Sequence, residues 1–225
     1  SSTRTKNCWL LRFASHFSQQ FFAGYNGVKV LMRKFRNLPK KENNQLSEKF
    51  SFLLKYNEDC TEEDFSWAAI TIFDHWLYET DSFNIIDEAT NEQKLEWDKR
   101  IKTFLSKLCD IEQPIRYKYV GRNTKQRLQF SRYVESPKVG EYVSNLFDDV
   151  YCPNIVFYAL GVDLWFEDNW TIHFKYKKQE DCLKMFSLAA EMNLFVLPAY
   201  SADHLNKYSV LSKYLSEQNL NTYEP

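Results

Sequence analysis

Basic residues alternate with apolar ones in two neighbouring segments, and this pattern predicts a β-hairpin with one cationic face. The segments are residues 115–120 and 127–134, and residues 121–126 form the turn between them. Because successive side chains of a strand point to opposite faces of a sheet, one face collects the basic residues. A two-stranded ribbon with a cationic face can dock on phosphate groups or on an acidic protein surface.

This basic hairpin, residues 115–134, is the first candidate for partner binding. Its predicted contact residues are Arg116, Lys118, Arg122, Lys125, Arg127 and Tyr133. The alternative is an ordinary solvated sheet face, because amphipathic strands carry the same alternation. Basic side chains interleaved with aromatic ones also suit single-stranded nucleic acid. The net charge of −1 and the pI of about 6.4 weaken that alternative, since nucleic-acid-binding domains are usually basic overall.

The second candidate is an acidic segment, residues 62–79, which the sequence predicts to be a helix opened by a capping-box-like start at 61–64. Its predicted contact residues are Glu62, Glu63 and Asp74, which would bind a basic partner. Asp74 precedes His75, and a carboxylate beside an imidazole can support general acid–base chemistry. The alternative places His75 at the rim of the core. The spacing matches no two-histidine or E-x-x-H metal motif, so no metal site is predicted.

The third candidate is a cluster of acids and tryptophans around a turn near residue 168. Its members are Asp163, Trp165, Glu167, Asp168, Trp170 and His173. Exposed tryptophans beside acids would form a protein-contact surface. The alternative is two core tryptophans around a polar turn.

Signatures of catalysis are missing from the sequence. No G-x-S-x-G elbow is present, and the five glycines form none of the clusters that cradle phosphates. The five cysteines are widely spaced and include no C-x-x-C pair, which argues against a disulfide framework and a zinc ribbon. A Cys–His pair could still meet in the fold. We therefore predict no cofactor and no catalytic residue, and the sequence leans against an enzyme while leaving an enzyme with a divergent site as an alternative.

The elements that would position these residues follow from hydrophobic periodicity. Helices are predicted over 8–22, 46–56, 65–77, 92–109, 139–147, 180–192 and after Ser201; strands over 28–35, 115–120, 127–134, 155–159, 162–166, 170–176 and 194–197. Residues 37–44 read as a loop and 80–91 as an acidic connection. This order predicts an α+β fold with a helix-rich N-terminal half and an antiparallel-sheet-rich C-terminal half. We expect one domain over 1–225, with possible lobes 1–110 (helical) and 111–225 (sheet-rich).

Charge and composition favour a binding protein. Residues 51–112 hold fifteen acidic residues against six basic ones, whereas residues 113–138 hold seven basic residues against one acidic. Such segregation shapes partner choice, and the 17% of aromatic residues offers contact surface. No run reads as a membrane span or signal peptide, so a cytoplasmic protein without membrane contact is expected. The leading hypothesis is an intracellular binding or inhibitor protein, such as an immunity-type antidote that masks a toxin or enzyme. Nucleic-acid binding through 115–134 is the alternative, and the oligomeric state stays open.

Overall fold

The computed structural model describes residues 34–54, 65–122, 126–145, 154–167, 170–198 and 205–220, and it confirms the predicted mixed α+β fold. All described residues belong to one compact unit, Arg33–Pro225. The expectation that 1–225 form a single domain stays a prediction, because residues 1–33 lie outside the description. The predicted helix 8–22 and nearly all of the predicted strand 28–35 also lie outside it.

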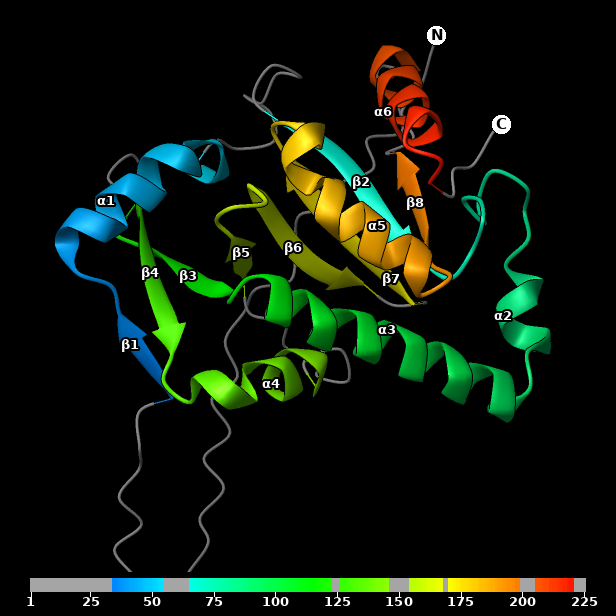
Figure 1. Cartoon of the computed structure of the whole chain (residues 1–225), viewed down its shortest axis with the longest axis horizontal. Coiled ribbons are helices and arrows are strands. Elements are labelled where there is room, and N and C mark those ends of the chain that lie inside the picture. The colour runs from blue at the N-terminus through cyan, green and yellow to red at the C-terminus, as the bar shows by residue number, and fades with distance from the viewer. Residues whose placement is uncertain are drawn as a thin grey trace, which may run out of the picture. The chain divides into compact units, whose positions relative to one another are not determined.

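The described part contains six α-helices and an eight-stranded sheet (Figure 1). The strands are β1 (Phe35–Asn37), β2 (Ser66–Thr71), β3 (Ile115–Val120), β4 (Arg127–Tyr133), β5 (Ile155–Phe157), β6 (Val162–Glu167), β7 (Thr171–Tyr176) and β8 (Phe195–Pro198). The helices are α1 (Lys40–Lys49), α2 (Asn84–Glu88), α3 (Asn91–Ile111), α4 (Val139–Asn145), α5 (Leu183–Glu191) and α6 (Leu205–Glu217). None of the described helices is long and apolar enough to cross a bilayer.

The sheet runs in the order β1-β4-β3-β5-β6-β7-β2-β8, and every neighbouring pair is antiparallel. The hairpin β3–β4 and the hairpin β6–β7 therefore lie side by side with only the short strand β5 between them. Strand β2, from the first half of the chain, is inserted between β7 and β8. Helices α3, α4 and α5 lie on one side of this sheet, in front of it in Figure 1.

The predicted helix over 65–77 is wrong, because residues Ser66–Thr71 form the strand β2. A strand that is buried on both faces reads as a continuous apolar run, and such a run cannot be distinguished from a buried helix by periodicity. Ile70 faces the helices α3 and α5, while Ala69 faces the opposite side, and both are fully buried. The acidic segment 62–79 is consequently not a helix with one exposed acidic face.

The predicted loop over 37–44 is also wrong, since helix α1 begins at Lys40. Its sequence is polar and has only one fully buried residue, Leu46, so no apolar stripe indicated a helix. The helix ends at Lys49 and a 3-10 turn, Ser51–Leu54, follows it, so the predicted helix 46–56 covers parts of both. Tertiary contacts with the sheet, more than local propensity, hold this helix.

Asn43 of α1 protects the outer edge of β4. Strand β1 pairs only with residues 131–133 of β4, which leaves the preceding backbone groups of β4 without a strand partner on that side. The Asn43 side chain accepts a hydrogen bond from the Phe130 N–H (2.8 Å) and donates one to the Leu128 carbonyl (3.2 Å). These bonds satisfy the edge of the sheet and join α1 to the hairpin.

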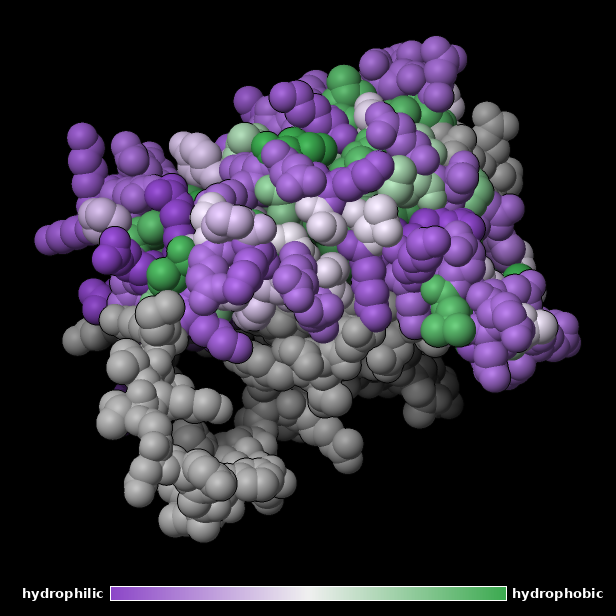
Figure 2. Space-filling view, turned by 60° about the horizontal axis from the view of Figure 1, so that its bottom comes forward, coloured by the Kyte–Doolittle hydropathy of each residue, from purple (hydrophilic) through white to green (hydrophobic). Residues whose placement is uncertain are grey.

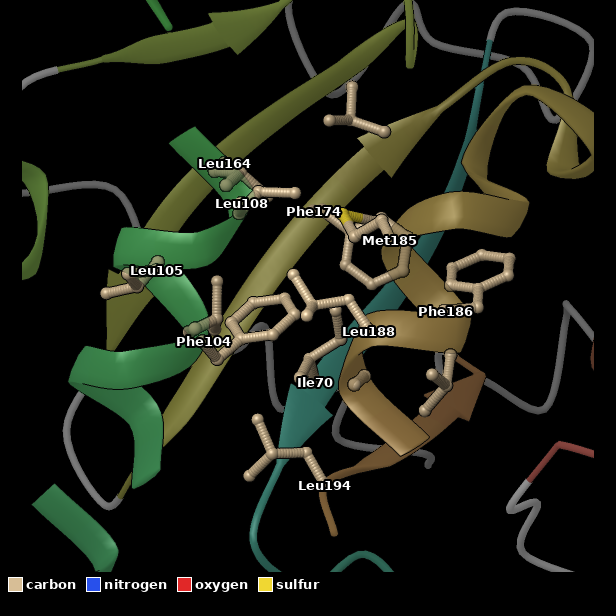
Figure 3. Close-up of a cluster of buried hydrophobic side chains, with 14 of the residues drawn as sticks. Ile70, Phe104, Leu105, Leu108, Leu164, Phe174, Met185, Phe186, Leu188 and Leu194 are labelled. Carbon is tan, nitrogen blue, oxygen red and sulfur yellow. The ribbon is translucent and has the colours of Figure 1, made fainter. Parts of the chain in front are cut away.

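The larger hydrophobic core lies between the sheet and helices α3 and α5. Helix α3 begins at a capping box made by Thr90 and Gln93, and its inward face carries Phe104, Leu105 and Leu108. Figure 3 shows Phe104 and Leu108 on the side of α3 that is turned toward Leu164 and Phe174 of the sheet and Leu188 of α5. The predicted helix 92–109 and its buried face are confirmed.

A second core cluster lies on the opposite face of the sheet, under α1. Leu46, Phe50 and Phe52 pack there against Tyr117 and Phe130 of the hairpin. The sheet is thus covered on both faces where β3 and β5 meet, because Ile155 faces α3 and Val156 faces α1. This second cluster fixes which side of the hairpin is buried.

Candidate partner interface

The hairpin β3–β4 has the register that the sequence predicted. Arg116 is paired with Ser131, Lys118 with Gln129 and Val120 with Arg127, so these side chains share one face. The opposite face is the buried one: Ile115, Tyr117, Leu128 and Phe130 belong to the core cluster under α1. Tyr119 also belongs to this face by alternation, but it is 42% exposed, and its hydroxyl donates to the Leu53 carbonyl.

Exposed cations occupy the outer part of this face. Lys118, Arg122 and Arg127 are exposed, and none of them forms an ion pair with a described carboxylate. Arg132 differs, because it lies on the α1 side of the hairpin and pairs with Glu42. Lys125 lies outside the described residues. Two like charges on one small face, with a third in the adjoining turn, repel one another, so an anionic partner would be favoured there.

The inner part of the same face is aromatic. The Arg116 guanidinium lies over the Phe35 ring, 4.8 Å from its centroid. Tyr133 stacks on Tyr142 of α4 with centroids 4.7 Å apart, and both tyrosines make T-shaped contacts with Phe35. These contacts hold Arg116 against the sheet, whereas Lys118 and Arg127 reach into solvent. We give the name cationic face to the surface formed by Arg116, Lys118 and Arg127 on this side of the hairpin and by Arg122 in the adjoining turn.

The acidic candidate residues do not form a comparable surface in the described chain. Glu62 and Glu63 lie outside the described residues. Asp74 lies in the bend that follows β2, its side chain is mostly exposed, and its Oδ1 lies 2.6 Å from His75 Nδ1. The helix predicted over this segment is wrong, because residues Ser66–Thr71 form β2, and partner binding by Asp74 stays a prediction.

The cluster around residue 168 is divided between the two faces of the sheet. Trp170 donates its indole N–H to Asp98 Oδ1 at 2.6 Å and meets Trp97 edge-on. Trp165 and His173 stack with centroids 5.3 Å apart on the opposite face. Trp165 and Trp170 are half-buried and contact other aromatic rings, so neither is a fully exposed contact residue or a fully buried core residue.

Asp163 is the buried polar centre of this region. It is 5% exposed, and its Oδ1 has no hydrogen-bond partner. Burial raises the pKa of Asp163 to about 7, against the lowering effects of the Lys175 charge and of a hydrogen bond with Tyr117. Burial likewise raises the pKa of Tyr117. The Lys175 ammonium lies 4.8 Å from the Trp67 ring centroid, so the charge sits against aromatic faces.

The described cysteines do not have the properties of nucleophiles. Cys109 and Cys182 are free and buried. Burial raises the pKa of the Cys109 thiol to about 12 and also raises that of Cys182, so both are protonated thiols at neutral pH. Reactive cysteines have the opposite shift. Within the described ranges, no group of three or more His, Cys, Asp or Glu side chains could hold a metal ion.

Sequence reasoning missed several residues that the fold brings together. Phe35 and Tyr142, which flank the cationic face, come from segments that are far apart in the chain, so no local pattern linked them. Glu42, Glu112 and Tyr158 line one cavity with Arg132 and were not singled out either. The sequence offered one signal, the close spacing of basic residues in the hairpin. That signal identified the exposed cations of the cationic face but not the aromatic residues beside them.

The fold and this surface define a mixed α+β protein that presents a cationic β-hairpin face. Comparison with known proteins gives no family model, no curated protein and no solved structure that matches the chain.

Proposed function

We propose that the protein is a binding protein that docks on an acidic surface of another protein through its cationic face. The observation that supports this proposal is the exposure of Lys118 and Arg127 on one face of the hairpin, and of Arg122 in the adjoining turn, with no described carboxylate paired to them. Charged patches of this kind accelerate association and select partners of opposite charge. An inhibitor of the immunity type, which masks a toxin or enzyme inside the cell, is the specific form that we propose.

Nucleic acid is the less favoured partner for the same face. Base stacking needs aromatic rings that are open to the ligand. The rings beside the cationic face are already in contact with other groups: Phe35 is covered by Arg116, and Tyr133 stacks on Tyr142. The remaining attraction would be to phosphate alone, which gives binding with a steep salt dependence.

A photo-crosslinking experiment in the native cell tests the proposal. Gln129 lies between the exposed cations, directly opposite Lys118, and is replaced by a photoreactive phenylalanine analogue. We expect a crosslinked protein partner that is lost when Lys118→Glu, Arg122→Glu and Arg127→Glu are added. A matched control reverses three exposed lysines elsewhere, with Lys99→Glu, Lys107→Glu and Lys184→Glu, and should keep the crosslink.

Two outcomes would contradict docking on an acidic protein. One is a crosslinked protein whose yield is the same in both triple variants. The other is a crosslinked species that nuclease removes, which would assign the face to nucleic acid. Circular dichroism of each purified variant checks that the fold is retained.

A further inference from the structure

A cavity of about 340 Å³ lies on the α1 side of the hairpin, away from the cationic face. It is bounded by α1, by the start of β3, by the end of β4 and by the turn that joins β5 to β6. Leu46 and Ile115 line it with buried apolar surface. Small-molecule sites combine such an apolar lining with a few polar groups, and their volumes begin at about 300 Å³.

The polar wall of the cavity has an uncompensated negative charge. Arg132 is paired with Glu42, so these two charges cancel. Glu112 has no cationic partner among the described residues. Its oxygens instead accept hydrogen bonds from the Ala159 N–H (2.7 and 2.9 Å) and the Leu160 N–H (3.3 Å). These neutral donors fix the carboxylate in place without cancelling its charge.

Tyr158, which lines the cavity, is already in contact with a cation from outside the lining, Lys49. The Tyr158 ring has the Lys49 ammonium 4.5 Å from its centroid, and Lys49 also donates to the Tyr158 carbonyl at 2.6 Å. Lys49 does not line the cavity itself. Gln113, which does, donates from its amide nitrogen to Ser136, so its carbonyl oxygen is left to accept from a ligand.

We propose that this cavity binds a small primary amine, with the ammonium group at Glu112 and the aliphatic stem on Leu46 and Ile115. An ammonium group supplies three donors to a wall that is rich in acceptors, and the apolar lining covers the stem. A carboxylate ligand would meet Glu112 with like charge. The site is independent of the cationic face, because Arg132 and Ile115 point to the other side of the hairpin.

An NMR titration of the full chain with three four-carbon probes tests the charge preference. The probes are n-butylamine, butyrate and n-butanol, which share one stem and differ in charge. We expect n-butylamine to bind with a Kd of about 1–10 mM, as suits a fragment of this size, and to bind at least tenfold more tightly than the other two. Shifted amide signals should belong to residues that line the cavity. Equal binding of all three probes, or no binding of n-butylamine, would overturn the proposal.

Two variants locate the binding. Gln45 lines the cavity from an exposed position on α1, so Gln45→Trp should fill the space and abolish n-butylamine binding. Asn44→Trp, at the neighbouring exposed position outside the lining, is the matched control and should leave the Kd unchanged. Glu112→Gln should weaken n-butylamine at least tenfold. If Glu112→Gln does not fold, the comparison of Gln45→Trp with Asn44→Trp still tests the proposal. Binding of n-butylamine to Gln45→Trp would show that the amine binds outside this cavity.

Discussion

Asp163 and Lys175 lie directly opposite each other on β6 and β7, on the sheet face that is turned away from α3 and α5. Aromatic rings of Phe65, Trp67 and Trp165 lie around the Lys175 ammonium. A carboxylate and an ammonium that are placed in such apolar surroundings lose hydration, and their mutual attraction offsets only part of that cost. The pair therefore makes the stability of the sheet sensitive to pH and to the loss of either partner.

Stability should fall as the pH rises from about 4 to about 7. Burial raises the pKa of Asp163 from 3.8 to about 7 in the fold, so over this range the native state keeps a proton that the unfolded chain releases. The stabilisation is complete below pH 3.8 and is lost as the pH passes through about 7. Because protonation and folding are linked, the raised pKa contributes up to about 4 kcal/mol to the free energy of unfolding at low pH. Asp163→Asn should flatten this slope in urea denaturation measured at several pH values; an unchanged slope would contradict the assignment.

Lys175→Met should raise the pKa of Asp163 further. The Lys175 charge lowers that pKa in the native protein, and its removal leaves the carboxylate without its opposite charge. The measurement is an NMR titration of the Asp163 side-chain carboxyl. Lys178→Met, at an exposed position, is the control and should leave the pKa of Asp163 unchanged. A pKa that is equal in the wild type and Lys175→Met would show that the two groups are not coupled.

Leu108→Ala and Leu95→Ala should differ strongly in stability although they make the same change on the same helix. Leu108 is fully buried in the core below α3, whereas Leu95 is 67% exposed. Truncation of the buried leucine removes apolar contacts and leaves a cavity, which costs about 2–5 kcal/mol. The exposed truncation should change the free energy of unfolding by about 0.5 kcal/mol or less. Chemical denaturation measures both, and similar losses would contradict the orientation of α3.

Thr90→Ala should lower stability by about 1 kcal/mol. The Thr90 side chain accepts from the Gln93 backbone N–H at 3.2 Å, and the Gln93 side chain accepts from the Thr90 N–H at 2.8 Å. Alanine removes the first of these bonds at the exposed start of α3. Thr90→Ser keeps the hydroxyl and should retain most of the stability, measured as the midpoint of thermal unfolding. Equal losses in both variants would show that the hydroxyl is not the cause.

The alternation of apolar and polar residues and the helical periodicity predicted those elements that have one buried and one solvent-exposed face. Helix α3 and the hairpin β3–β4 are of this kind, and both were found with their buried residues except for the exposed Tyr119. Strand β2 was misread because Ala69 and Ile70, on opposite faces, are both buried, which removes the period-2 contrast. Helix α1 was missed because its stability comes from contacts of Leu46 and Asn43 with the hairpin, which a single segment does not reveal.

The candidate site was predictable only in its outer part. Arg127 and Lys118 follow from the alternation of one hairpin, and the structure leaves them exposed. The stacking of Arg116 on Phe35 depends on a strand that joins the hairpin from the N-terminal side, and local sequence carries no record of that pairing. The amine cavity draws on four separate segments, so only the folded chain could reveal it.

The position of β2 between β7 and β8 sets the order in which the protein can fold during its synthesis. β2 hydrogen-bonds along both edges to strands that leave the ribosome much later: Ala68 is matched with Phe174 on one side and with Pro198 on the other. Until β7 and β8 have been synthesised, the apolar residues of β2 have no neighbouring strands to pair with. A nascent chain that stalls before residue 170 would expose this segment to chaperones or to aggregation, whereas the later hairpin β3–β4 pairs locally as soon as it emerges.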